Sequence, residues 1–499
     1  MSNPEVVQVI QRQINNGQYS EAVDSINIVC SQPGGKLPEA FGVQLFPTLV
    51  NAEEDYIARC CKALEKLLEF TPVEVIIGQM EVQLKQGFDH PSPLVKKLCL
   101  KQLHRAVKDR RNLKLIGEVG IMKHAILLLE DEDSSVVKEC NKILVTLASY
   151  DEGVIILYSD QGVKLLKEVM RKSDTIRYRV FDIIIDSILI SDQAFEFASA
   201  AGFLPKILED LESSDVLLQL TALENVSRLS DSPTAYTQLR NLGIFKGVGA
   251  WLGSTDSAQS PNASYTVPSV IKLFAKLSQK HNVDIKQFCE EAPQYFPAVC
   301  SLLESNDISI KYACVDVLTL LNARVDGKQV VLSAPCAARA VHVLSNLAIR
   351  GVDDIKDRAL VALAHIFSSP EVYIPDFETK TATWFAQCHN VLVKDTLQVL
   401  SLPSPPRQCA AASLLSNLAV HKYGIEAITR VPGWCERLVD RRYCSDSEAQ
   451  AQRFSLILAI KRSPVIEEHA DREIINKLTK YINEGAHYRE TAPTAVLEL

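Results

Sequence analysis

Two apolar stretches separated by an acidic turn recur along this chain, and this pattern limits the folds open to it. One copy, residues 120–149, reads GIMKHAILLLEDEDSSVVKECNKILVTLAS. In its second half, the residues on one helical face are all apolar: Val136, Cys140, Ile143 and Leu147. The Asp and Ser residues of the turn can accept hydrogen bonds from the first free N–H groups of that helix. A single helical hairpin cannot bury its own apolar faces, so we expect neighbours of the same kind.

These neighbours follow with a constant period. Successive copies open at Gly120, Gly162, Gly202 and Gly243, and an Asp begins the second helix of the first three copies at Asp133, Asp174 and Asp215. The glycines suit the positive φ at which one helix ends before the next begins. A purely helical period of about 41 residues is typical of armadillo and HEAT repeats. With weaker copies on both sides, the pattern predicts an all-α, right-handed α-solenoid of about eleven or twelve armadillo/HEAT-like units.

Breaks in the helical pattern suggest how the solenoid is divided. The polar stretch GSTDSAQSPNASYT (253–266) predicts a flexible insertion, and GAHYRETAPTAVLEL (485–499) predicts a loose tail. We therefore expect N-terminal repeats over 1–252 and C-terminal repeats over 267–484.

Bulk properties favour an intracellular protein. The longest apolar run, VFDIIIDSILI, is interrupted by two Asp residues, so we expect no membrane span, and the N-terminus lacks a signal-peptide pattern. The thirteen cysteines are scattered without a C-x-x-C motif, as in reduced cores. A net charge of −8 argues against nucleic-acid binding. We expect a cytoplasmic protein that is a monomer when free, and leave the nucleus open as a second compartment.

Catalytic patterns do not occur in the sequence. It contains no phosphate-binding loop, no H-E-x-x-H pair and no G-x-S-x-G nucleophile elbow. The ten histidines are dispersed, and the paired carboxylates lie in solvated turns. We therefore expect no enzyme activity, no catalytic residues, no cofactor and no metal.

One region departs from the acidic balance. Residues 96–114 hold eight Lys or Arg and a single acid, Asp109. Lys97, Lys101, Arg105 and Lys108 are spaced so that they form a stripe along one helix face. The stripe is either a solvated face or a docking strip for an acidic protein surface, and both readings stay open.

In a solenoid the second helix of each pair should line a concave groove. Aligning the helix ends places further candidate protein-binding residues in that groove. Together with the stripe, the candidates are Lys97, Lys101, Arg105, Lys108, Lys142, Thr146, Glu224, Arg228, His365 and Asn417.

Five segments resemble a known family. They are GFDHPSPLVK (87–96), IRYRVFDIII (176–185), VDGKQVV (325–331), TWFAQ (383–387) and YINEGAHY (481–488). Their order and spacing are similar to those of the 26S proteasome non-ATPase regulatory subunit 5 family. This resemblance implies a chaperone for assembly of the proteasome regulatory-particle base. It implies binding to ATPase-ring subunits 1 and 2 with the large non-ATPase scaffold subunit, through the C-terminal domain of ATPase subunit 1. It also implies that the bound chaperone blocks premature docking onto the core particle.

Two other functions remain open on sequence grounds. A cargo adaptor of the nuclear-import kind would need Trp and Asn ladders along the groove. The three tryptophans, Trp251, Trp384 and Trp434, do not fall at expected ladder positions. A general armadillo-type protein–protein scaffold is the second alternative, and only the family resemblance speaks against it.

Overall fold

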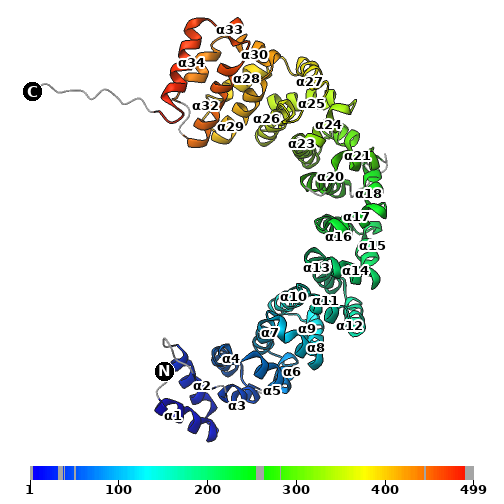
Figure 1. Cartoon of the computed structure of the whole chain (residues 1–499), viewed down its shortest axis with the longest axis vertical. Helices are drawn as coiled ribbons and strands as arrows, with labels where there is room; N and C mark the ends of the chain where they lie inside the picture. The colour runs from blue at the N-terminus through cyan, green and yellow to red at the C-terminus, as the bar shows by residue number, and fades with distance from the viewer. Residues whose placement is uncertain are drawn as a thin grey trace, which may run out of the picture. The chain divides into compact units, whose positions relative to one another are not determined.

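Every regular element that the structure describes is a helix. The structure is a computed structural model, and it describes residues 4–31, 37–38, 40–49, 52–253, 263–280, 283–442 and 446–488. The fold class is the predicted α-solenoid (Figure 1). No single helix in these ranges is long and apolar enough to cross a membrane, and the one pair that passes on length and composition is bent by 106°.

The chain forms two compact units. Unit 1 comprises Met1–Asp210 and Asp231–Tyr236, and unit 2 comprises Leu211–Ser230 and Thr237–Leu499. Two elements cross the division between the units: η4 (Asp210–Glu212) and α17 (Pro233–Asn241).

Long helices pack side by side in unit 1. They are α4 (Glu54–Glu69), α7 (Pro93–Val107), α10 (Ser134–Ala148) and α13 (Asp174–Ile190). Each contacts the next in chain order, and we call this row the long-helix layer of unit 1 (Figure 1). The other helices of unit 1 are α1 (Pro4–Asn15), α2 (Tyr19–Cys30), α3 (Ala40–Leu45), η1 (Phe46–Leu49), α5 (Val73–Gln79), α6 (Glu81–Phe88), η2 (Arg110–Asn112), α8 (Leu113–Val119), α9 (Met122–Leu127), η3 (Leu128–Glu130), α11 (Asp151–Leu157), α12 (Asp160–Met170), α14 (Asp192–Ala200) and α15 (Phe203–Glu209).

Unit 2 contains a second row of the same kind. Its long helices are α16 (Val216–Leu229), α20 (Ala263–Gln279), α23 (Ile308–Asn322), α26 (Asp353–Phe367), α29 (Pro405–Ala419) and α32 (Ser447–Arg462), and each packs on the next. The other helices of unit 2 are α18 (Ile244–Gly253), α21 (Ile285–Glu291), α22 (Tyr295–Leu302), α24 (Val325–Ser333), α25 (Ala337–Arg350), α27 (Phe377–Ala386), α28 (Leu392–Val399), α30 (Lys422–Thr429), α31 (Trp434–Val439), α33 (Ile466–His469) and α34 (Arg472–Glu484).

The apolar face predicted for the second helix of the hairpin is the core of the repeat. The four residues of that face are fully buried in α10: Val136, Cys140, Ile143 and Leu147. The predicted helix starts are also present. The side chains of Asp133 and Asp215 cap α10 and α16. At α13 the cap is Ser173, and Asp174 is the first helical residue.

The repeated glycines have two different physical roles. Gly120, Gly202 and Gly243 have positive φ, as predicted. The prediction was wrong for Gly162, which lies inside α12. A Cβ there would lie 2.2 Å from the carbonyl oxygen of Leu157, so this position needs a small residue for close helix approach.

Positively charged side chains bind the carbonyl groups at the ends of helices in neighbouring repeats. Arg324, just before α24, donates to the carbonyls of Ser278 at 3.1 Å and Lys280 at 2.8 Å, at the end of α20. Lys328 in α24 donates to the carbonyl of Ser368 at 2.8 Å, just past the end of α26. These carbonyls have no partner within their own helix, and the helix dipole adds to their attraction for a cation.

Parts of the predicted insertion and tail lie outside the described residues, namely 254–262 and 489–499. Residues 263–266 of the insertion are helical, because α20 begins at Ala263. At the start of the tail, Arg441 donates to the carbonyl of Ala486 at 3.2 Å, and its guanidinium lies over the Tyr488 ring at 5.4 Å. The predicted division of the chain at 253–266 and 485–499 stays a prediction.

Lys328 should make stability depend on pH in the alkaline range. It is 5% exposed, and burial lowers its pKa from the ordinary 10.5 to about 8. Between these two values the unfolded chain holds a proton that the folded chain has released, so stability rises with pH across this window. Lys328→Met keeps an apolar chain of similar length but does not titrate. We expect the thermal midpoint of the wild type to rise relative to that of Lys328→Met between about pH 8 and 10.5. Parallel curves would contradict this assignment.

Candidate protein-binding surface

Six of the ten candidate residues lie on two packed helices of unit 1. Lys97, Lys101 and Arg105 are on α7, and Lys108 caps its C-terminal end. Lys142 and Thr146 are on α10, which packs along α7 in the long-helix layer. The Thr146 hydroxyl lies 3.4 Å from Nε2 of His104 on α7, which joins the two helices directly.

Arg105 faces the repeat before it rather than open solvent. Its guanidinium donates to the carbonyl of Thr71 at 2.6 Å and also to the carbonyl of Leu68. Both carbonyls lie at the C-terminal end of α4. A third bond, at 3.0 Å, goes to the side-chain oxygen of Gln102. Arg105 therefore holds the end of a helix in place, and a direct part in partner binding stays a prediction.

Lys101 and Lys142 are different, because their side chains reach solvent; of their ion-pair partners, Glu65 is 51% exposed and Glu139 is 18% exposed. Lys101 lies 2.5 Å from Glu65, and Lys142 lies 2.7 Å from Glu139. About half of each lysine side chain is exposed, at 48% and 56% respectively. An exposed pair such as Lys101–Glu65 contributes about 0–1 kcal/mol, so a partner carboxylate can displace it at little cost.

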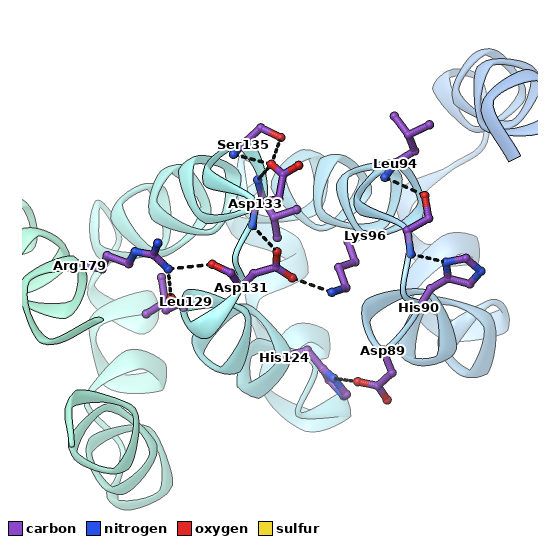
Figure 2. Close-up of polar contacts among 12 residues, drawn as sticks. Asp89, His90, Leu94, Lys96, His124, Leu129, Asp131, Asp133, Ser135 and Arg179 are labelled. Carbon is purple, nitrogen blue, oxygen red and sulfur yellow. Dashed lines mark hydrogen bonds and ion pairs between the residues drawn. The ribbon is translucent and has the colours of Figure 1, made fainter. Parts of the chain in front are cut away.

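An acidic turn fixes the position of α10 between its neighbours. Figure 2 shows Asp131 between Lys96 and Arg179. The Lys96–Asp131 ion pair is 2.6 Å long, and only 8% of the Asp131 side chain is exposed. Arg179 on α13 donates to the carbonyls of Leu129 at 2.7 Å and Asp131 at 2.9 Å. Lys96 and part of Arg179 therefore act inside the structure, even though both belong to basic segments.

Asp133 completes this turn as the cap of α10. Its carboxylate accepts hydrogen bonds from the backbone N–H groups of Ser135 at 2.7 Å and Val136 at 3.3 Å. Hydrogen bonds from the Ser135 side chain and backbone hold the pKa of Asp133 below its usual value, and the Val136 N–H and the charge of Lys97 act in the same direction. Lys97 thus contributes to the field around the cap.

A small cavity opens beside this turn, between α10 and α13. It has a volume of about 360 Å³, and its lining includes Lys138, Lys142, Arg179 and Asp182. Three cations face one carboxylate there, so the cavity suits an acidic side chain of a partner. Sequence reasoning missed Lys138 and Arg179. Lys138 could have been found, because it precedes Lys142 by one helical turn, whereas Arg179 comes from the next repeat.

The charge of this surface does not depend on histidine ionisation near neutral pH. Burial lowers the pKa of His104, and the charges of Lys108 and Lys142 lower it further, while Glu139 acts against them. His104 is therefore neutral at pH 7, and the positive charge is carried by Lys and Arg. We call the set Lys97, Lys101, Lys108, Lys138, Lys142 and Arg179 the basic surface of unit 1.

The other four candidates lie in unit 2 at two separate places. Glu224 and Arg228 are on α16, where Glu224 pairs with Lys276 of α20 at 2.8 Å. His365 is on α26 and Asn417 on α29, and Asn417 donates to the carbonyl of Ala364 at 2.7 Å. Burial and the charge of Lys328 lower the pKa of His365. The ten candidates are therefore divided between the two units, with six in unit 1 and four in unit 2.

Comparison with known proteins gives the same relatives along nearly the whole chain. A family model described as "Proteasome non-ATPase 26S subunit" matches residues 9–498. The 26S proteasome non-ATPase regulatory subunit 5 of Homo sapiens is 26% identical over 463 residues, covering 91% of this chain and 90% of that protein. The protein of the same name from Drosophila melanogaster is 22% identical over 446 residues, covering 86% and 82%. The matches span both units.

Substitution of Arg105 and of Lys101 should have different effects, because Arg105 bonds within the structure and Lys101 lies on the surface. We expect Arg105→Ala to weaken the C-terminal turn of α4 by about 2 kcal/mol, because two helix-end carbonyls lose a charged donor. Lys101→Ala, the control on the same helix, should cost less than about 1 kcal/mol. Hydrogen–deuterium exchange of the amides at 66–71 gives the readout, with exchange roughly thirtyfold faster in Arg105→Ala alone. Equal exchange in the two variants would show that the Arg105 bonds contribute little.

Proposed function

This chain belongs to the family of proteasome non-ATPase 26S subunits, and we propose from that membership that it is a chaperone for assembly of the regulatory-particle base. Its partners are then ATPase-ring subunits 1 and 2 with the large non-ATPase scaffold subunit. The observation that carries the proposal is the family match over residues 9–498, which includes every long helix of both units. We place the protein in the cytoplasm, as a monomer when free.

In this proposal the chaperone acts by binding and not by catalysis. Its partner is the C-terminal domain of ATPase subunit 1, held against the exposed side of the long-helix layer. The basic surface of unit 1 supports this, because the Lys142 side chain is 56% exposed and Lys101 makes an exposed, weak pair that a partner carboxylate can replace. Positive charge gathered on a protein of net charge −8 also steers an acidic partner surface towards this place.

A bound solenoid would also act as a steric block. The helices of each row pack in sequence, so each unit presents an extended surface in place of a single small pocket. A partner domain held on such a surface has much of its own surface covered. We propose that this covering delays docking of the ATPase ring onto the core particle until the chaperone leaves.

Affinity capture tests the identity of the partners. Tagged full-length protein is incubated with cytosol of its own source, and bound proteins are identified by mass spectrometry. We expect ATPase subunits 1 and 2 with the scaffold subunit, and no core-particle subunits. Recovery of other cargo without ATPase subunits would overturn the chaperone proposal in favour of a general armadillo-type scaffold or a cargo adaptor.

Charge reversal tests the basic surface itself. We expect Lys138→Glu with Lys142→Glu to weaken binding of the isolated C-terminal domain of ATPase subunit 1 at least tenfold, which is roughly 1.4 kcal/mol. The matched control is Lys164→Glu with Lys206→Glu, on α12 and α15 of the same unit, where both lysines are also exposed. The control should bind within about twofold of wild type in a titration at constant ionic strength. An equal loss of affinity in both variants would mean that the effect comes from the net charge alone.

A further inference from the structure

A second, larger groove lies in unit 2 and is not part of the surface described above. Its volume is about 740 Å³, within the range of ligand pockets in proteins. It runs along α25 and ends against the N-terminal ends of α23 and α26. It shares no residue with the candidates drawn from the sequence or with the basic surface of unit 1.

The floor and edges of this groove are apolar. Leu303 and Ile355 are buried beneath it, at 0% and 1% exposure. Val343 and Leu347 are one helical turn apart on α25 and are partly exposed along its length. At the edge of the groove, Val352 is 61% exposed.

The rim is positively charged. Lys311, Arg339 and Arg350 line the groove, with Glu304 as the single acid in the lining. Arg339 holds Glu304 through two hydrogen bonds of 2.7 and 2.8 Å, so that carboxylate is already neutralised. Within the described residues, Lys311 and Arg350 form no ion pair.

Among the described side chains, two acids lie close in sequence to the lining without being part of it, Asp307 and Asp354. Asp307 caps α23 and accepts the backbone N–H groups of Ser309 at 2.8 Å and Ile310 at 3.4 Å. Asp354, on the first turn of α26, is exposed and does not line the groove. Within the described lining, Lys311 and Arg350 thus lie beside an apolar floor, and the one acid, Glu304, is paired with Arg339.

We propose that this groove is a second protein-docking site, and that it binds a short acidic segment of a partner protein anchored by apolar side chains. Apolar side chains would cover Val343, Leu347 and Val352, and carboxylates would pair with Lys311 and Arg350. The complementarity of charge determines the class of partner, because a basic or neutral segment would leave both cations unpaired. The inference does not rest on the proposed chaperone function, since the two surfaces have no residue in common.

Fluorescence anisotropy with the full-length protein tests this directly. The probe is a fluorescein-labelled twelve-residue peptide with Leu at positions 3, 6, 7 and 10 and Glu at the others. We expect saturable binding to wild type, with loss of at least tenfold in affinity when Ser replaces the Leu residues or Lys replaces the Glu residues. No binding of the acidic probe at millimolar protein, or equal binding of the Ser probe, would overturn the proposal.

Variants locate the binding within the molecule. Lys311→Glu with Arg350→Glu should weaken the acidic probe at least tenfold, and Val352→Ser should weaken it with no change of charge. The matched control is Lys394→Glu with Lys422→Glu, two exposed lysines of unit 2 outside the groove. Circular dichroism and thermal melting show that each variant is folded. Equal weakening in the control would mean attraction by net charge alone, and would overturn the assignment.

The same assay separates this inference from the chaperone proposal. Lys138→Glu with Lys142→Glu, which tests the basic surface of unit 1, should bind the acidic probe like wild type. If that variant binds the acidic probe more weakly, the peptide binds in unit 1, and the proposed docking site in unit 2 is wrong. If the affinity capture recovers no ATPase subunits while the acidic probe binds normally, only the chaperone proposal is contradicted, and the proposal for the groove in unit 2 holds.

Discussion

The structure depends on side chains from one repeat binding carbonyl groups at a helix end in a neighbouring repeat. The last four carbonyls of any helix lack partners within it, and the helix dipole makes that end attractive to cations. Arg105, Arg324 and Lys328 each bind two such carbonyls of a neighbouring repeat. Arg453, which is 1% exposed, binds the carbonyl of Leu400 in the preceding repeat and that of Asp440 just before its own helix. These bonds fix the register of one repeat on the next, which apolar packing alone specifies less strictly.

This constraint divides the cations of the chain into two groups. Lys96 and Arg105 lie in the same basic segment as Lys101, yet both bond to groups of neighbouring repeats. The side chains of Lys101 and Lys142 are about half exposed, so their charge remains available to a partner. A count of positive residues in 96–114 therefore overstates the charge that a partner would meet. The charge that matters for binding is what remains after the helix ends are satisfied.

The local pattern of the sequence predicted the repeats well and predicted the surface poorly. The buried face of α10 and the cap at Asp133 follow from spacing within one helix, so both were predicted correctly. Gly162 was assigned a positive φ because it keeps the repeat period, but it serves close packing against Leu157. Arg179 was missed because its contacts lie in the preceding repeat, at Leu129 and Asp131. The period of the sequence shows which face of a helix is apolar. It does not show which polar side chains form hydrogen bonds with a neighbouring repeat.

A chain of this architecture can hold two docking surfaces that respond to their partners independently. In a solenoid, stability is close to a sum of repeat terms and nearest-neighbour terms. A ligand on α7 and α10 stabilises those helices and the repeats in direct contact with them. The groove along α25 is separated from α10 in the chain by the repeats that end in α13, α16 and α20. Binding at one surface should therefore change affinity at the other very little, so that each partner can be exchanged without releasing the other.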